Sequence, residues 1–350
     1  IWITGVFGIA TKYAEAVLAL RYRVTLPDGQ HAGGPMYVLA RGLGMPWLGT
    51  LFAVFTAIAA FGIGNMVQSN SIALMASNSF GIDQKVTGVV LMVITGLVVL
   101  GGIRWIARAC QVLVPFMVIF YILGCLILLV MHAERLPDTV MTILRSAFTG
   151  QAAVGGFVGA GVREAIRMGV ARGLFSNESG LGSAPILAAA ARSRNPVRQG
   201  LVSASGTFWD TVVVCLMTGL VIVNSGQWTS GTKEVVLTRL AFTDIPVVGE
   251  PVLVVALFTF VFSTILGWAY YGEKAVEYLF GTRARLPYRM LWVAAVYGGT
   301  VLPASIWTIA DLTNGLMAIP NLIALLGLTG VVVNETQKYL WSGRLDEAEE

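Results

Sequence analysis

The sequence predicts an all-α polytopic membrane protein, and three observations support this prediction. Hydrophobic residues make up 56% of the chain and charged residues only 12%, with a mean hydropathy of +0.76. A soluble domain carries roughly 25% charged residues, so this composition favours a chain surrounded by lipid. The apolar residues gather in blocks of about 20, the length of one helical crossing. The positive charges fall between alternate blocks, as they do in membrane proteins.

Nine apolar segments of spanning length divide the chain, and together they form one predicted transmembrane domain over residues 1–350. They cover residues 1–20, 47–77, 86–101, 106–131, 147–190 (broken by glycines), 201–223, 251–271, 290–302 and 306–333. Eighteen of the 23 Lys and Arg residues lie in one set of alternate loops or in the adjoining ends of the spans. The positive-inside rule therefore predicts that loop 21–46 and the C-terminal tail lie in the cytoplasm, in a multi-pass protein of the plasma (inner) membrane.

The composition also excludes several classes of site. Three cysteines and two histidines, all far apart, give neither a disulfide framework nor a transition-metal site. No segment brings Ser, His and Asp together, so we expect no enzyme and no cofactor. The chain opens on Ile1, already inside an apolar block, and no signal peptide is visible. We therefore expect that membrane segments preceding Ile1 are missing.

Residues 149–192 contain the stretch around which we expect the chain to be organised. Four glycines, Gly155, Gly156, Gly159 and Gly161, interrupt what would otherwise be a span. Each glycine costs a helix about 1 kcal/mol relative to alanine, so regular helix is locally weak. Opened backbone survives at membrane depth only where protein buries it or where it lines a wet cavity, which makes this break a candidate binding site. The alternative is that the glycines only let two helices pack closely.

Polar residues within the other spans provide further candidates. Asn65 and Gln68 share one helix face and could hold a substrate or join neighbouring helices. Ser263 and Thr264 carry adjacent hydroxyls that suit a hard cation, although such hydroxyls often bond to carbonyls of their own helix. Asp210 is either an ion or proton site or, as we favour, a structural carboxylate held by neighbours such as Thr211.

Two other polar patterns remain open. Asp311 and Asn314 form a pair three residues apart near one end of the ninth span, where they could line a gate or cap the interface. RGLFSNESGLGSAP, which includes Arg172, Asn177 and Glu178, contains glycines beside small polar residues but no phosphate-loop lysine. It is either a tight turn between two helices or an inner gate.

Several motifs together resemble the alanine or glycine:cation symporter family of the amino acid–polyamine–cation superfamily. They are FGIATKYAEAVLALRYR, AGGPMYVLARGLG, GIGNMVQSNS, AAVGGFVGAG, RGLFSNESGLGSAPI and SGTFWDT, and they extend over essentially the whole chain. The resemblance implies an inverted five-plus-five helix repeat in which the first helix of each repeat is broken. It also implies that the family's first core helix precedes Ile1, that the first span here is core helix two, and that the glycine-broken span is core helix six.

The resemblance implies a function as well. The protein would import alanine or glycine by alternating access, with sodium as the coupling ion. Gln68, with Asn65 beside it, would contact the amino acid, and the backbone around Gly155, Gly156 and Phe157 would line the site. Thr264 would serve both substrate and sodium, and Ser263 would serve sodium. A proton-coupled amino acid transporter and a channel-like protein are the alternatives. The expected partners are the amino acid, sodium and lipid, with no nucleic acid, in a monomer.

Overall fold

A computed structural model describes residues 1–148, 161–229, 235–246, 249–301 and 306–348 of the chain. The described chain is helical apart from a short antiparallel hairpin. This hairpin pairs β1 (Val24–Thr25) with β2 (His31–Ala32), with Val24 opposite Ala32. The chain forms two compact units. The first comprises residues 1–7, 114–177 and 207–259, and the second comprises residues 8–113, 178–206 and 260–350.

Five helical segments of the described chain are long and apolar enough to cross a membrane, which confirms a multi-pass architecture. Each lies where the sequence predicts a span. They are α1 (Trp2–Arg21); α3 (Pro46–Ala59) continuing through η2 (Ala60–Met66) into α4 (Val67–Phe80); α6 (Ile103–Met131); α10 (Pro196–Thr207) continuing through η5 (Phe208–Val214) into α11 (Cys215–Asn224); and α13 (Gly249–Phe280). Both η2 and η5 are π-helical turns, in which the helix widens by one residue.

Local sequence explains where these helices begin and end. Pro46 opens α3 at a position whose N–H is unpaired in any helix, and Gly81 closes α4 in the left-handed conformation. Asp83 caps α5 (Gln84–Val99) by accepting a hydrogen bond from the Lys85 backbone N–H at 2.8 Å. The helix α6 runs through Pro115 in its interior.

The ninth predicted span differs from the structure. It was expected as one segment over residues 306–333, but α15 (Ile306–Gly327) ends at Gly327, and the chain turns by 57° into the next helix. The turn lies at Leu328, whose ψ of 17° departs from helical geometry. The third and eighth predicted spans correspond to α5 and α14 (Arg285–Val301).

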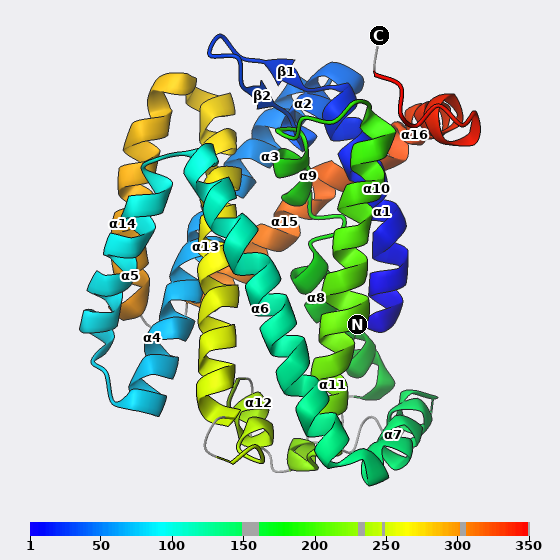
Figure 1. Ribbon diagram of the computed structural model, residues 1–350. Coiled ribbons are helices and arrows are strands. Elements are labelled where there is room, and N and C mark those ends of the chain that lie inside the picture. Colours follow the sequence, from blue (N-terminus) through cyan, green and yellow to red (C-terminus); the bar gives the residue numbers. More distant parts are fainter. Residues whose placement is uncertain (149–160, 230–234, 247–248, 302–305, 349–350) are drawn as a thin grey trace. The chain divides into compact units, whose positions relative to one another are not determined.

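The core of the second unit forms where α14 packs against α5, α4 and η2 while α15 packs against α3, and Figure 1 shows α14 beside α5. Trp292 and Phe52 are both fully buried in it. Shorter elements of this unit complete it: α2 (Pro35–Tyr37), η1 (Val38–Gly42), α9 (Ala184–Ala188), η7 (Thr282–Ala284), α16 (Thr329–Thr336) and η8 (Gln337–Trp341).

The first unit is held by contacts between its own helices. Tyr121 on α6 shares a 2.7 Å hydrogen bond with the Thr218 hydroxyl, and its ring stacks on Phe242. Thr139 donates to the Asn224 side chain at 3.0 Å. Besides parts of longer helices, this unit contains η3 (Ala133–Arg135), α7 (Leu136–Phe148), α8 (Gly161–Asn177), η6 (Gln227–Thr229) and α12 (Val235–Phe242).

Candidate functional site

The π-helical turn η2 positions two of the predicted site residues. In this turn the Val67 N–H reaches back five residues to the Gly62 carbonyl. Gln68 donates its side-chain amide to the Ile63 carbonyl at 3.0 Å, so the side chain is anchored to the same turn. Asn65 is fully buried and donates to the Trp292 carbonyl at 2.9 Å, which joins η2 to α14. The Oδ1 atom of Asn65 has no hydrogen-bond partner among the residues that the structure describes.

The helix α13 approaches this turn closely and runs antiparallel to it. A Cβ added at Gly64 would collide with the Trp268 Cβ, and one added at Gly272 would lie 2.8 Å from the Ala60 Cβ. Ala60 in η2 therefore lies opposite Gly272 in α13, and Gly64 lies opposite Trp268, so the two helices run in opposite directions. From this register we expect Gln68 to lie opposite Thr264, one further turn along the two helices.

The hydroxyls of Ser263 and Thr264 on α13 bond within their own helix. This is one of the two interpretations that the sequence left open. Ser263 donates to the Phe260 carbonyl at 2.8 Å, and Thr264 donates to the same carbonyl at 3.0 Å. Because each hydroxyl oxygen is still an acceptor, this bonding is compatible with coordination of a cation. Hydroxyls commonly make such bonds to carbonyls of their own helix without a ligand, so the bonds to Phe260 are not evidence for one.

Two glycine-to-alanine substitutions, at Gly64 and at Gly267, test the close contact between η2 and α13. We expect Gly64→Ala to destabilise the protein by about 1–3 kcal/mol, because the new methyl group meets a Cβ that has no rotamer to move to. Gly267 lies next to Trp268 on α13, and among the residues that the structure describes no atom lies within 4 Å of a Cβ added there. Gly267→Ala should therefore leave the thermal midpoint of the detergent-solubilised protein unchanged or raise it slightly. Equal effects of the two changes would contradict the close contact.

Between α8 and α9 the backbone opens, at residues 178–183, inside the second unit. Ser179, Leu181 and Ser183 are all buried, and Gly180 and Gly182 both have positive φ. This stretch belongs to RGLFSNESGLGSAP, which the sequence suggested as a tight turn or an inner gate. Buried irregular backbone needs protein partners for its polar groups, and this segment has them.

The partner that binds this segment is Glu15 on α1, which is 3% exposed. Its Oε1 atom accepts hydrogen bonds from the backbone N–H groups of Gly180 and Gly182, at 3.0 and 3.2 Å, and from the Asn321 amide at 2.6 Å. Asn321 also donates to the Gly180 carbonyl at 2.9 Å. Within the described chain, the second oxygen, Oε2, accepts no hydrogen bond.

Glu178 joins the same segment to α13. Its Oε1 atom accepts from the Trp268 indole N–H at 3.0 Å, and its Oε2 atom accepts from the Ser183 hydroxyl at 2.7 Å. Sequence reasoning missed Glu15, Asn321 and Trp268 as members of one site. These three residues lie more than 50 residues apart along the chain, so no local pattern connects them.

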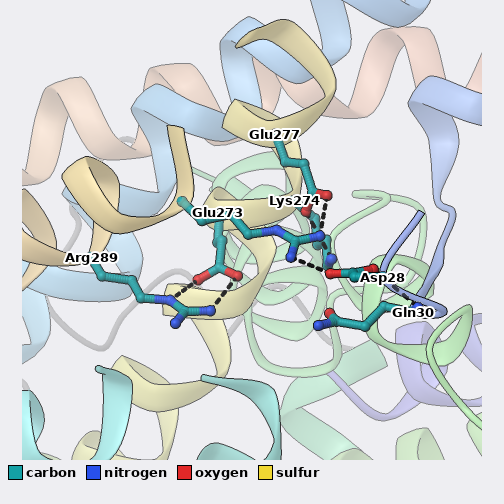
Figure 2. Close-up of polar contacts among 7 residues, drawn as sticks. Asp28, Gln30, Glu273, Lys274, Glu277 and Arg289 are labelled. Carbon is teal, nitrogen blue, oxygen red and sulfur yellow. Dashed lines mark hydrogen bonds and ion pairs between the residues drawn. The ribbon is translucent and has the colours of Figure 1, made fainter. Parts of the chain in front are cut away.

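A second polar cluster lies at the end of α13 and joins it to α14 and to the β1–β2 hairpin (Figure 2). Glu277 accepts from Lys274 at 2.8 Å and from Arg285, and Arg285 also donates to Asp28. Next to it, Arg289 makes two bonds to the Glu273 carboxylate, at 2.6 and 2.9 Å. We interpret this cluster as structural, because its charges are paired with one another.

Two residues outside the spans, Asp28 and Tyr37, have pKa values that are shifted in part by the charges of this cluster. The hydrogen bond from Arg285 lowers the pKa of Asp28, and a backbone bond from Gln30 acts in the same direction. Burial raises the pKa of Tyr37 to about 12, and the nearby charge of Glu277 adds to the shift.

The remaining sequence candidates have different outcomes. Asp210 is partnered, as we favoured, by the hydroxyls of Ser176 at 2.7 Å and Thr211 at 2.8 Å. Asp311 is exposed whereas Asn314 is buried. The predicted backbone site at Gly155, Gly156 and Phe157 lies outside the described residues. Within the described residues no group of three or more His, Cys, Asp or Glu side chains could hold a metal ion.

Comparison with known proteins gives one consistent family. The model of the sodium:alanine symporter family matches residues 1–350. A sodium/alanine symporter of Methanococcus maripaludis is 49% identical over 347 residues, covering 97% of this chain and 76% of that protein. An uncharacterized transporter of Haemophilus influenzae is 48% identical over 343 residues, covering 97% and 75%. A probable sodium/glutamine symporter of Bacillus subtilis is 34% identical over 342 residues, covering 97% and 70%.

Proposed function

The chain belongs to the sodium:alanine symporter family, and from that premise we propose that it imports alanine or glycine together with sodium. The family consists of cation-coupled amino acid symporters, so the chain is a membrane transporter and not an enzyme. Relatives are named for alanine and for glutamine, which leaves the amino acid itself to the proposal. We favour a small amino acid and a sodium-coupled alternating-access cycle.

The observation that carries the proposed site is the antiparallel contact of η2 and α13. In this proposal the register seen at Gly64–Trp268 and Ala60–Gly272 continues for one turn, so that Gln68 and Thr264 lie at the same level. The opened backbone bound by Glu15 and Glu178 is joined to α13 through Trp268. In this proposal the Gln68 amide and Asn65 contact the amino acid, and Thr264 contacts both substrate and sodium, with Ser263 on the sodium side. Trp268, packed on Gly64 between these turns, forms a wall of the site.

The opened segment also limits where the substrate carboxylate binds. The N–H groups of Gly180 and Gly182 already donate to Glu15, so they are engaged within the protein. We therefore keep the expectation that backbone groups around Gly155, Gly156 and Phe157 meet the substrate carboxylate. A site bounded by aromatic side chains excludes larger amino acids by about 1–3 kcal/mol for each added methylene group.

Uptake into proteoliposomes by the full-length protein tests this proposal. We expect sodium-driven uptake of alanine and glycine that disappears when choline replaces sodium at constant pH. Gln68→Ala should raise the KM for alanine about 10- to 100-fold, because a hydrogen bond to a charged group is lost, and Thr264→Ala should weaken both alanine and sodium binding.

Thr329→Ala provides the matched control. The Thr329 hydroxyl also bonds to the carbonyl four residues earlier, at 2.9 Å, but it is exposed on α16. This variant should transport like the wild type. Uptake unaffected by both Gln68→Ala and Thr264→Ala would reject the site, and uptake that persists in choline with a proton gradient would favour proton coupling.

A further inference from the structure

Glu178 has an unusual backbone conformation. Its φ is +56°, which makes it the one non-glycine residue with positive φ in the described part of the chain. This left-handed conformation costs an ordinary residue roughly 1–2 kcal/mol, and glycine adopts it freely. Strain of this kind persists where the surrounding structure holds it, and it clusters at functional sites.

The two carboxylate oxygens of Glu178 accept hydrogen bonds from different donors. One accepts the indole N–H of Trp268 at 3.0 Å, and the other accepts the Ser183 hydroxyl at 2.7 Å. The Ser183 bond fixes the carboxylate within the opened segment. The carboxylate then presents its first oxygen to α13, the helix that carries Trp268.

Trp268 is the group that this arrangement orients. Its side chain is 3% exposed, and its Cβ packs against the Gly64 backbone of η2. The Tyr271 ring meets it edge-on at a centroid distance of 5.3 Å. An indole has a single N–H donor, so one fixed acceptor is enough to select the direction in which the ring points.

We propose that Glu178 is a positioning residue, which holds the Trp268 indole against the Gly64 turn and thereby sets the size of amino acid that the site accepts. This inference rests on the proposed function, because it takes Trp268 as a wall of the substrate site. Glu178 acts through Trp268 and does not itself contact the substrate.

The test is a double-mutant cycle on uptake of alanine, glycine and glutamine by the full-length protein. Glu178→Gly removes the side chain while favouring the left-handed backbone. We expect it to raise the KM for alanine about tenfold, the size of effect for one hydrogen bond to a charged acceptor. The maximal rate should change little, and the preference for alanine over glutamine should narrow.

Three further variants make the cycle specific. Trp268→Phe removes the N–H donor and should lower the same selectivity, and the Glu178→Gly change should add little on that background. Glu178→Gln should transport like the wild type, because its Oε1 accepts from the indole and its amide donates to the Ser183 hydroxyl. Ser183→Ala removes the hydroxyl that bonds to the other carboxylate oxygen of Glu178 and should have a smaller effect on selectivity.

Each contrary outcome is informative. Additive effects of Glu178→Gly and Trp268→Phe, or a Glu178→Gln variant as impaired as Glu178→Gly, would overturn the positioning role. If Glu178→Gly does not accumulate, Glu178→Met, which has similar length and no strong acceptor, replaces it in the cycle. A wild-type protein that takes up none of the three amino acids would overturn the proposed function and this inference together, whereas additivity in an active protein overturns the inference alone.

Discussion

Glu15→Ala is expected to destabilise the protein more than any other single change considered for the opened segment. The substitution leaves the N–H groups of Gly180 and Gly182 and the amide of Asn321 without their common acceptor. Each unpaired buried donor costs about 1–3 kcal/mol, so the three together cost roughly 3–9 kcal/mol. The thermal midpoint and yield of the full-length protein in detergent would both fall sharply.

Two graded variants separate the hydrogen bonds from the charge. Glu15→Gln keeps one acceptor oxygen for the three donors and should lose less stability than Glu15→Ala. Asn321→Ala removes its bonds to Glu15 and to the Gly180 carbonyl, so an intermediate loss is expected. Glu134→Ala removes an exposed carboxylate and should change nothing measurable. A Glu15→Ala protein with the midpoint of the wild type would show that Glu15 does not hold the segment.

The helices themselves were predictable from the sequence because apolar length and end signals are local. Pro46 and Gly81 lie at the two ends of the α3–η2–α4 segment, close to the predicted limits 47–77. The bend after Gly327 was missed, because the helices on its two sides together are apolar enough for one span. A single departure from helical geometry at Leu328 leaves no mark on composition.

The polar core was harder to predict than the helices. The segment at 178–183 has the composition of a surface loop, with glycines and small polar residues, and it was interpreted as a turn or gate. Its burial depends on Glu15 and Asn321, which approach it from α1 and α15 and lie more than 100 residues from it in the sequence. Gly155, Gly156 and Phe157, which we singled out as the break, lie outside the described residues and stay a prediction.

Asn65 also bonds to a partner that is distant in the sequence and that local sequence does not indicate. The sequence left open whether its amide holds a substrate or another helix. The amide donates to the Trp292 carbonyl, 227 residues away, so one of its groups joins helices. Which groups remain for a ligand depends on partners that no local pattern predicts.

Glu277→Ala is the second change for which we expect a large effect, of about 3–5 kcal/mol, because it breaks a buried ion pair from one side. Glu277 is 4% exposed and Lys274 is 1% exposed, and Arg285 donates to the same carboxylate (Figure 2). Water cannot easily replace the lost acceptor for Lys274. Unfolding of the purified protein by heat or denaturant measures the loss.

Asp28→Asn is the control that compares an exposed ion pair of Arg285 with the buried pair at Glu277. Asp28 also bonds to Arg285, but its side chain is 37% exposed, so its contribution is at most about 1 kcal/mol. Because Arg285 lowers the pKa of Asp28 in the folded protein, this contribution is present above the unfolded pKa of about 4. It is lost as the pH falls through the lower folded value. The difference between wild type and Asp28→Asn should therefore disappear in acid, and equal losses from Asp28→Asn and Glu277→Ala at neutral pH would contradict the role of burial.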